Sequence, residues 1–140
     1  MSKAQSKTKG TPRGTFPDLG GLDVCLNVKA IAASVEFYGK LGFRQAEGEQ
    51  AKGWSVQERN GVRIGLFKGF IEATTLNFRG GDVGAIVKEA EKRGLKPYDV
   101  RIIKEDGVGN AHLKDPDGTL IFFDTTPEER NRRKAQTARL

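Results

Sequence analysis

The sequence predicts a single α+β domain made of two βαβββ units. Along residues 20–126, a strand pattern, an amphipathic helix pattern and three short strand patterns occur in that order twice. Gly42 and Gly94, which close the two helix patterns, are 52 positions apart, and the helix starts Ala30 and Asp82 have the same spacing. A repeat this regular indicates a duplicated structural unit.

The first unit opens with a strand at residues 22–28, where apolar and polar side chains alternate. Residues 30–41 follow with apolar side chains at i, i+4, i+7 and i+10, the stripe of an amphipathic helix. Gly42 is the expected C-terminal cap, and Asn60-Gly61 predicts a tight hairpin turn between the last two strands. Three short strands are predicted, at residues 43–47, 54–59 and 62–67.

The second unit repeats this order. A strand is predicted at residues 74–79, and Asp82 is a plausible N-cap for a helix that ends at Gly94. The turn Asp115-Pro116-Asp117-Gly118 joins the final two strands, and we expect its carboxylates to accept hydrogen bonds from nearby backbone. The last three strands are predicted at residues 98–103, 109–114 and 120–124.

The positive charge of the chain is confined to its two ends. The net charge of +6 divides into +3 at residues 1–19 and +3 at residues 127–140, which leaves residues 20–126 neutral. We therefore expect a flexible basic N-terminal tail, one domain at residues 20–126 and a charged C-terminal tail. Tails of this charge support only weak, salt-sensitive contact with acidic partners, and no motif predicts specific binding of nucleic acid.

The composition is that of an ordinary globular protein, with 36% hydrophobic and 30% charged residues. No apolar run reaches the length of a membrane span, and the N-terminus lacks the apolar segment of a secretory signal. The single cysteine, Cys25, cannot form an internal disulfide, and we expect it to be a small buried side chain. These features predict a cytoplasmic protein that does not associate with a membrane.

Three stretches of the chain resemble the vicinal-oxygen-chelate superfamily, which includes glyoxalase, bleomycin-resistance proteins and extradiol dioxygenases. They are LDVCLNVKAIAASVEFYGKLGF (residues 22–43), TLNFRGGDVGAIVKEAEKRGL (75–95) and DPDGTLIFF (115–123). The resemblance implies a curled mixed sheet with helices on the convex face and a ligand site on the concave face. It also implies that the protein forms a homodimer.

Members of this superfamily that use a metal place His or Glu at four positions of the concave face. The resemblance aligns those positions with Asp23, Gly65, Thr75 and Phe122. A first-row metal ion needs about three good nitrogen or oxygen ligands, and only Asp23 qualifies. We therefore expect no metal, no cofactor and no metal-dependent glyoxalase, dioxygenase or thiol-transferase chemistry.

The expected function is binding or sequestration of a small organic molecule in the concave cleft, with no catalytic residue assigned. A planar or cationic ligand would stack on Trp54 or Phe122 and pair with Asp23 or Asp124. The alternation of the strands also turns Cys25, Arg63, Phe67 and Arg79 toward this face, while the facing of His112 stays open. The expected ligand-binding residues are Asp23, Asn27, Trp54, Gly65, Thr75, Asn77 and Phe122.

Other interpretations of the same residues remain open. One is a metal-independent lyase or isomerase, in which Asp23 and His112 are the acid and base. Another is an interaction module that binds acidic partners through its basic tails. Trp54 also suits a core or dimer interface, and His112 suits a strand surface. Four side chains could instead pair with carboxylates in a closed cleft without ligand, namely Asn27, Asn77, Arg63 and Arg79.

Overall fold

A computed structural model describes residues 16–103 and 106–132 and confirms the two βαβββ units. The elements of the first half are β1 (Gly20–Asn27), α2 (Ile31–Lys40), β2 (Arg44–Glu49), the 3-10 turn η2 (Gln50–Lys52), β3 (Trp54–Arg59) and β4 (Val62–Phe67). Those of the second half are β5 (Thr75–Gly80), α3 (Val83–Lys92), β6 (Tyr98–Ile102), β7 (Gly109–Lys114) and β8 (Leu120–Thr125). Residues 127–132 add a short helix.

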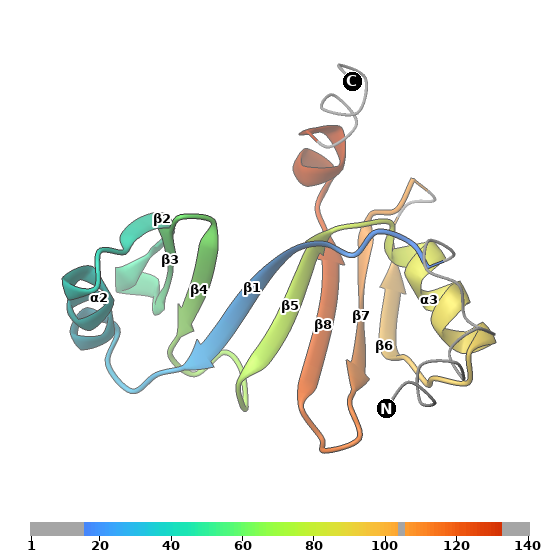
Figure 1. Ribbon diagram of the computed structural model, residues 1–140, viewed down its shortest axis with the longest axis horizontal. Coiled ribbons are helices and arrows are strands. Elements are labelled where there is room, and N and C mark those ends of the chain that lie inside the picture. Colours follow the sequence, from blue (N-terminus) through green and yellow to red (C-terminus); the bar gives the residue numbers. More distant parts are fainter. Residues whose placement is uncertain (1–15, 104–105, 133–140) are drawn as a thin grey trace, which may run out of the picture.

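The strands form one eight-stranded mixed sheet in the order β2-β3-β4-β1-β5-β8-β7-β6 (Figure 1). In each half the first strand pairs in parallel with the last, β1 with β4 and β5 with β8. The two halves join where β1 and β5 pair antiparallel at the centre. The sheet curls without closing into a barrel, as the predicted fold class requires.

The two long helices lie at opposite ends of the sheet. Helix α2 contacts β2, β3 and β4, and α3 contacts β7 and β8 (Figure 1). Among the described residues, no helix is long and apolar enough to cross a membrane.

The local signals that predicted helix and hairpin ends are confirmed. The Asp82 side chain accepts a hydrogen bond of 3.0 Å from the Ala85 backbone N–H, which caps α3. Gly42 follows α2 with a φ of 95°, the left-handed conformation that ends many helices. Asn60 and Gly61 both have positive φ, 51° and 83°, as a two-residue hairpin turn requires.

An apolar core lies between α3 and its half of the sheet. Val83 and Ile86 of α3 meet Phe123 of β8, and each of these side chains is at most 5% exposed. Phe16 and Leu19 pack against this core, although the sequence assigned them to the N-terminal tail. Ordered packing therefore begins before β1. The remainder of the two predicted tails, residues 1–15 and 133–140, lies outside the described residues.

Candidate functional site

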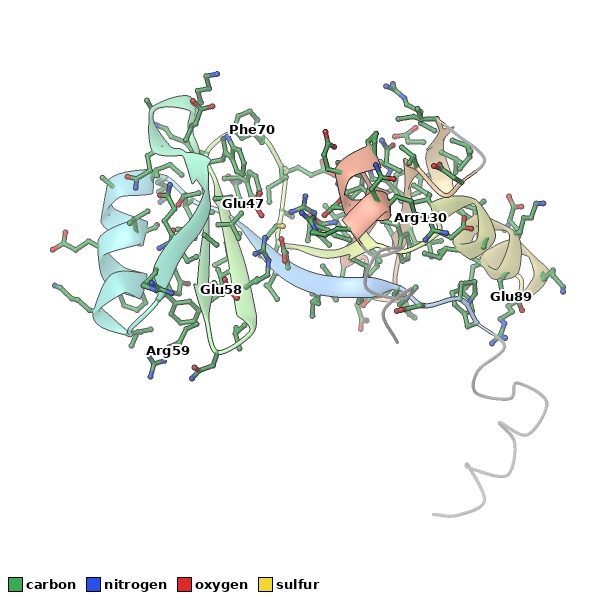
Figure 2. All side chains as sticks on the ribbon, turned by 90° about the horizontal axis from the view of Figure 1, so that it is seen from above. Glu47, Glu58, Arg59, Phe70, Glu89 and Arg130 are labelled. Carbon is green, nitrogen blue, oxygen red and sulfur yellow. The ribbon has the colours of Figure 1, made fainter. Side chains whose placement is uncertain are left out.

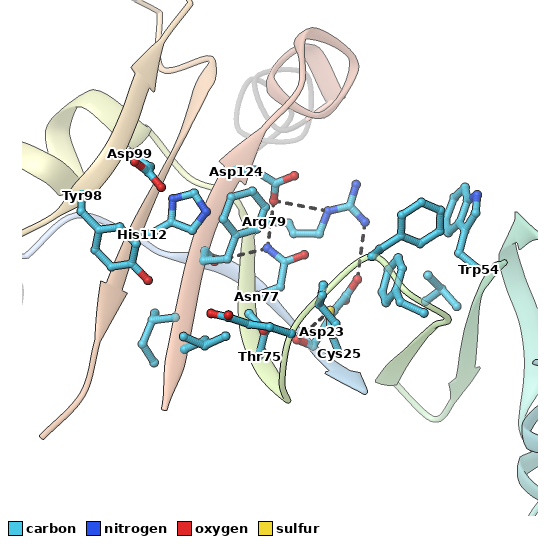
Figure 3. A pocket seen from close by; sticks show the side chains of 18 of the residues that line it. Asp23, Cys25, Trp54, Thr75, Asn77, Arg79, Tyr98, Asp99, His112 and Asp124 are labelled. Atoms are coloured by element: carbon cyan, nitrogen blue, oxygen red, sulfur yellow. Dashed lines mark hydrogen bonds and ion pairs between the residues drawn. The ribbon is translucent and has the colours of Figure 1, made fainter. Parts of the chain in front are cut away.

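The concave face of the sheet holds a cleft of about 580 Å³, lined by side chains from both halves. Its floor is made by the central strands, with Asp23 and Cys25 on β1 and Thr75 and Asn77 on β5 (Figure 3). All four side chains are at most 9% exposed. Asp23 and Cys25, on the face of β1 that the sequence marked as polar, are therefore buried, while Leu22 on the opposite face is 42% exposed.

The first half contributes a cluster of three aromatic rings to the cleft, which we call the first ring cluster: Trp54, Phe67 and Phe70. The Trp54 and Phe67 rings are nearly parallel, at 4°, with their centroids 6.1 Å apart. Phe70, on the loop between β4 and β5, stands edge-on to Phe67 and is 60% exposed at the rim.

The second half contributes the second ring cluster: Tyr98, His112 and Phe122, from β6, β7 and β8. His112 lies between the other two rings, with centroid distances of 5.2 Å to Tyr98 and 4.8 Å to Phe122. Its Nδ1 atom is buried and has no hydrogen-bond partner in the described part of the chain. In Figure 3 Tyr98 and His112 lie on the opposite side of the cleft floor from Trp54.

Asp23, the carboxylate that the sequence singled out, is held by two arginines. Arg63 Nε donates to Asp23 Oδ1 at 2.7 Å, and Arg79 Nη1 lies 3.4 Å from Oδ2. Arg63 also donates to Glu47 on β2, and the hydrogen bonds to Asp23 and Glu47 raise the pKa of its guanidinium. Both oxygens of Asp23 are thus occupied by protein cations. The sequence left open that arginines pair with carboxylates in a closed cleft. The pairing is present, but the cleft stays open.

Arg79 connects this network to the second half and to the helix at residues 127–132. Its Nη2 atom lies 3.1 Å from Glu129 Oε2, and its Nε atom lies 3.7 Å from Asp124 Oδ1 (Figure 3). Asn77 Nδ2 donates to the same Asp124 oxygen at 2.9 Å. Burial raises the pKa of the Asp124 carboxyl against the lowering effects of Asn77 and Arg79.

Cys25 is a buried part of the floor. Burial, reinforced by the nearby Asp23 charge, raises the pKa of its thiol to about 12. The thiol is therefore protonated at physiological pH and is neither a nucleophile nor a good metal ligand.

The structure brings most of the expected site residues together but not all of them. Asn27 is exposed near the end of β1 and does not line the cleft. Gly65 lies beneath the Phe67 ring, since a Cβ atom built on it would stand 2.7 Å from Phe67 Cε2. The expected residues that do line the cleft are Asp23, Trp54, Thr75, Asn77 and Phe122.

Sequence reasoning missed several residues of the cleft. Glu47 follows an irregularity in the pairing of β2 with β3. The side of the sheet on which its side chain lies therefore cannot be predicted from simple alternation along the strand. Asp99 lies at a similar irregularity on β6 and has a φ of 47°. Phe70 is on a loop, where no periodicity applies, although an aromatic residue in the short segment between two predicted strands was a usable signal.

None of the four positions aligned with metal ligands carries His or Glu. Asp23 is ion-paired, and Gly65, Thr75 and Phe122 offer at most one hydroxyl. Among the described residues, no three His, Cys, Asp or Glu side chains gather in a way that could hold a metal ion.

Comparison with solved structures identifies the fold. The chain is similar to a glyoxalase/bleomycin resistance protein/dioxygenase superfamily member from Vibrio splendidus 12B01, with a TM-score of 0.56 and 15% identity over 74% of this chain and 97% of that one. The chain has the vicinal-oxygen-chelate fold.

Two further solved structures match this chain. One is described as an NAD-dependent benzaldehyde dehydrogenase from Legionella pneumophila, with a TM-score of 0.61 and 20% identity over 75% of this chain and 98% of that one. The other is a methylmalonyl-CoA epimerase variant from Streptomyces coelicolor, with a TM-score of 0.51 and 17% identity over 81% and 96%. No family model and no curated protein matches the chain. At these identities the likeness concerns the fold alone.

Proposed function

We propose that this protein binds a small organic molecule with a flat aromatic part in the concave cleft, and that it does so without a metal ion. The observation that carries this proposal is the pair of ring clusters, one from each half, that line a single hollow of about 580 Å³. A volume of this size is typical of small-molecule pockets, which combine apolar walls with a few fixed polar groups.

The ring clusters suit a planar ligand for energetic reasons. Each aromatic contact in offset or edge-on geometry contributes about 0.5–1.5 kcal/mol beyond the burial of apolar surface. A ligand that touches Trp54 on one side and Phe122 on the other gains such contacts from both halves. The Trp54 ring already packs against Phe67, and the Phe122 ring against His112. Ligand binding therefore does not require either ring to leave a polar partner.

Binding is better supported than catalysis. An acid–base mechanism through Asp23 needs a carboxylate free to exchange a proton with the ligand, but Arg63 and Arg79 hold both of its oxygens. His112 is sandwiched between Tyr98 and Phe122, which favours a packing role for its ring. Metal analysis of the purified protein tests the metal-free part of the proposal, and near-stoichiometric Zn, Ni, Mn or Fe would contradict it.

Trp54 is the only tryptophan, so its fluorescence reports directly on the cleft. We expect a panel of planar aromatic compounds to include ligands that quench it saturably and raise the melting temperature. Phe122→Ala should weaken binding of such a ligand by roughly tenfold, from the loss of ring contact and apolar burial. Phe37→Ala is the matched control, because Phe37 is 58% exposed on α2 and does not line the cleft.

Two outcomes would count against the proposal. The first is a panel in which no compound changes either the fluorescence or the melting temperature. The second is equal affinity of the Phe122→Ala and Phe37→Ala variants for a compound that does bind.

We further propose that the protein is a cytoplasmic homodimer with no specific nucleic-acid partner. The neutral charge of residues 20–126 supports the absence of a nucleic-acid surface on the domain. Sedimentation of the full chain at several concentrations tests the dimer. A monomer throughout the micromolar range would contradict it.

A further inference from the structure

We propose that the cleft selects a flat nitrogen heterocycle that is basic at its ring nitrogen, and that Asp124 accepts the N–H of the protonated ring. This inference rests on the proposed function and names the ligand class for the same cleft. It depends on one carboxylate oxygen, Asp124 Oδ2, and on its position beside the second ring cluster.

Asp124 is the inner carboxylate of the cleft that keeps a free oxygen. Its Oδ1 atom receives the Asn77 amide and lies near Arg79, but no donor of the described residues reaches Oδ2. Asp23 has both oxygens engaged, and Glu47 is bound by Arg63 and Arg79. Since Asp124 lines the cleft, its free oxygen is an inner acceptor available to a ligand there, whereas the other lining carboxylates, Glu72 and Asp99, are exposed.

The spacing on β8 places this acceptor at the edge of a stacked ring. Phe122 and Asp124 are two residues apart on one face of the strand, a separation of about 7 Å. A bicyclic ligand that covers Phe122 therefore reaches Asp124 with an atom of its edge. Asn77 fixes this arrangement, because its amide donates to Phe122 O at 3.2 Å as well as to Asp124.

The charges around Asp124 favour a base over an acid. The guanidiniums of Arg63 and Arg79 are shared among four carboxylates, those of Asp23, Glu47, Asp124 and Glu129, so a ligand anion would meet an excess of negative charge. Arg79 Nε, a buried N–H without a hydrogen bond to the described residues, lies 3.7 Å from Asp124 Oδ1. Burial disfavours the Asp124 carboxylate alone, which suits pairing with a cation brought by the ligand. The titratable, charged or polar groups that surround Asp124 on the neighbouring elements are Asp23, Asn77, Arg79, Asn110, His112 and Glu129.

The number of protons is the same for both starting protonation states of ligand and Asp124. A protonated heterocycle meets the Asp124 carboxylate directly, or a neutral heterocycle takes the proton from the neutral Asp124 carboxyl. Both routes end in the same pair, a ring N–H⁺ donating to Asp124 Oδ2. Affinity is therefore highest between the pKa values of the two groups and falls on either side.

Two probes of equal size test the inference: 4-aminoquinoline, which is protonated at its ring nitrogen near neutral pH, and 1-aminonaphthalene, which has C–H at that position. We expect calorimetric titration of the wild-type protein to give roughly tenfold or greater preference for 4-aminoquinoline, the effect of a charge-assisted hydrogen bond. Asp124→Asn should abolish the preference while keeping affinity for 1-aminonaphthalene. Asp117→Asn, which removes an exposed carboxylate outside the cleft, should retain it.

Each outcome separates the inference from the proposed function. Equal affinity of the wild type for the two probes, or a preference that survives in Asp124→Asn, overturns the role of Asp124 but leaves the aromatic cleft intact. Binding of neither probe to the wild type contradicts both. The wild-type comparison needs no variant, so it decides the question even if Asp124→Asn does not fold.

Discussion

Replacing Arg63 with methionine should destabilise the fold by about 2–3 kcal/mol. Arg63 supplies the shortest ion pair of the buried Asp23 carboxylate, at 2.7 Å, and the Asp23 side chain is only 5% exposed. Without Arg63, Asp23 retains only Arg79 at 3.4 Å. Breaking a buried pair commonly costs about 3–5 kcal/mol. We expect less here because Arg79 stays and because the Arg63 side chain is 27% exposed.

Urea unfolding followed by Trp54 fluorescence measures this loss, and for a domain of this size the melting temperature should fall by roughly 10 °C. Lys52→Met is the control, since the Lys52–Glu49 pair is largely exposed and should contribute less than about 0.5 kcal/mol. The double variant Asp23→Asn/Arg63→Met should recover part of the lost stability. It no longer buries the Asp23 carboxylate, which in Arg63→Met has lost its shorter ion pair. A loss below about 0.5 kcal/mol in Arg63→Met would refute the reasoning.

Three further predictions concern the cleft. Cys25, whose thiol pKa is about 12, should resist a thiol reagent in the folded protein at neutral pH and react promptly in denaturant; equal rates would contradict its burial. The raised pKa of Asp124 means that the folded state holds this proton more tightly than the unfolded state, so its contribution to stability is lost as pH rises through that pKa. The difference in unfolding free energy between Asp124→Asn and wild type should therefore shift in favour of the variant from about pH 4 to about pH 7, and a flat difference would contradict it. Gly65→Ala should displace the Phe67 ring and cost about 1–3 kcal/mol, with a change in Trp54 emission that an undisturbed cleft would not give.

The fold was predictable because its signals are local and occur twice. Glycines after both helices, an Asn-Gly hairpin turn and the Asp82 cap depend only on neighbouring backbone, so each could be recognised from a few residues. The Asp115 turn is of the same kind, with its side chain accepting from the Asp117 and Thr119 backbone at 2.9 Å and 2.8 Å. The spacing of these signals then fixed the order of the elements.

The site was less predictable because it depends on contacts between distant segments. Alternation correctly turned Asp23, Arg63 and Arg79 toward the concave face, but it could not show that the two arginines, 40 and 56 residues away along the chain, pair with Asp23. The sequence named Asp124 beside Asp23 as a carboxylate that could pair with a cationic ligand, but it could not choose between the two. Its significance follows from the free oxygen, which becomes apparent only when Asn77 and Arg79 are placed beside it.

The antiparallel pairing of β1 with β5 is the one place where the sheet passes from the first half to the second. The pairing of those two strands, with its twist, is therefore one of the four strand pairings that set the separation of Trp54 on β3 from Phe122 on β8. For the proposed planar ligand, we therefore expect selectivity for ligand size to depend on the backbone, and substitutions on the far side of β1, such as at the half-exposed Leu22, to alter it without touching the ligand. Variants selected for a bulkier ligand should accordingly include changes at this seam as well as in the rings themselves.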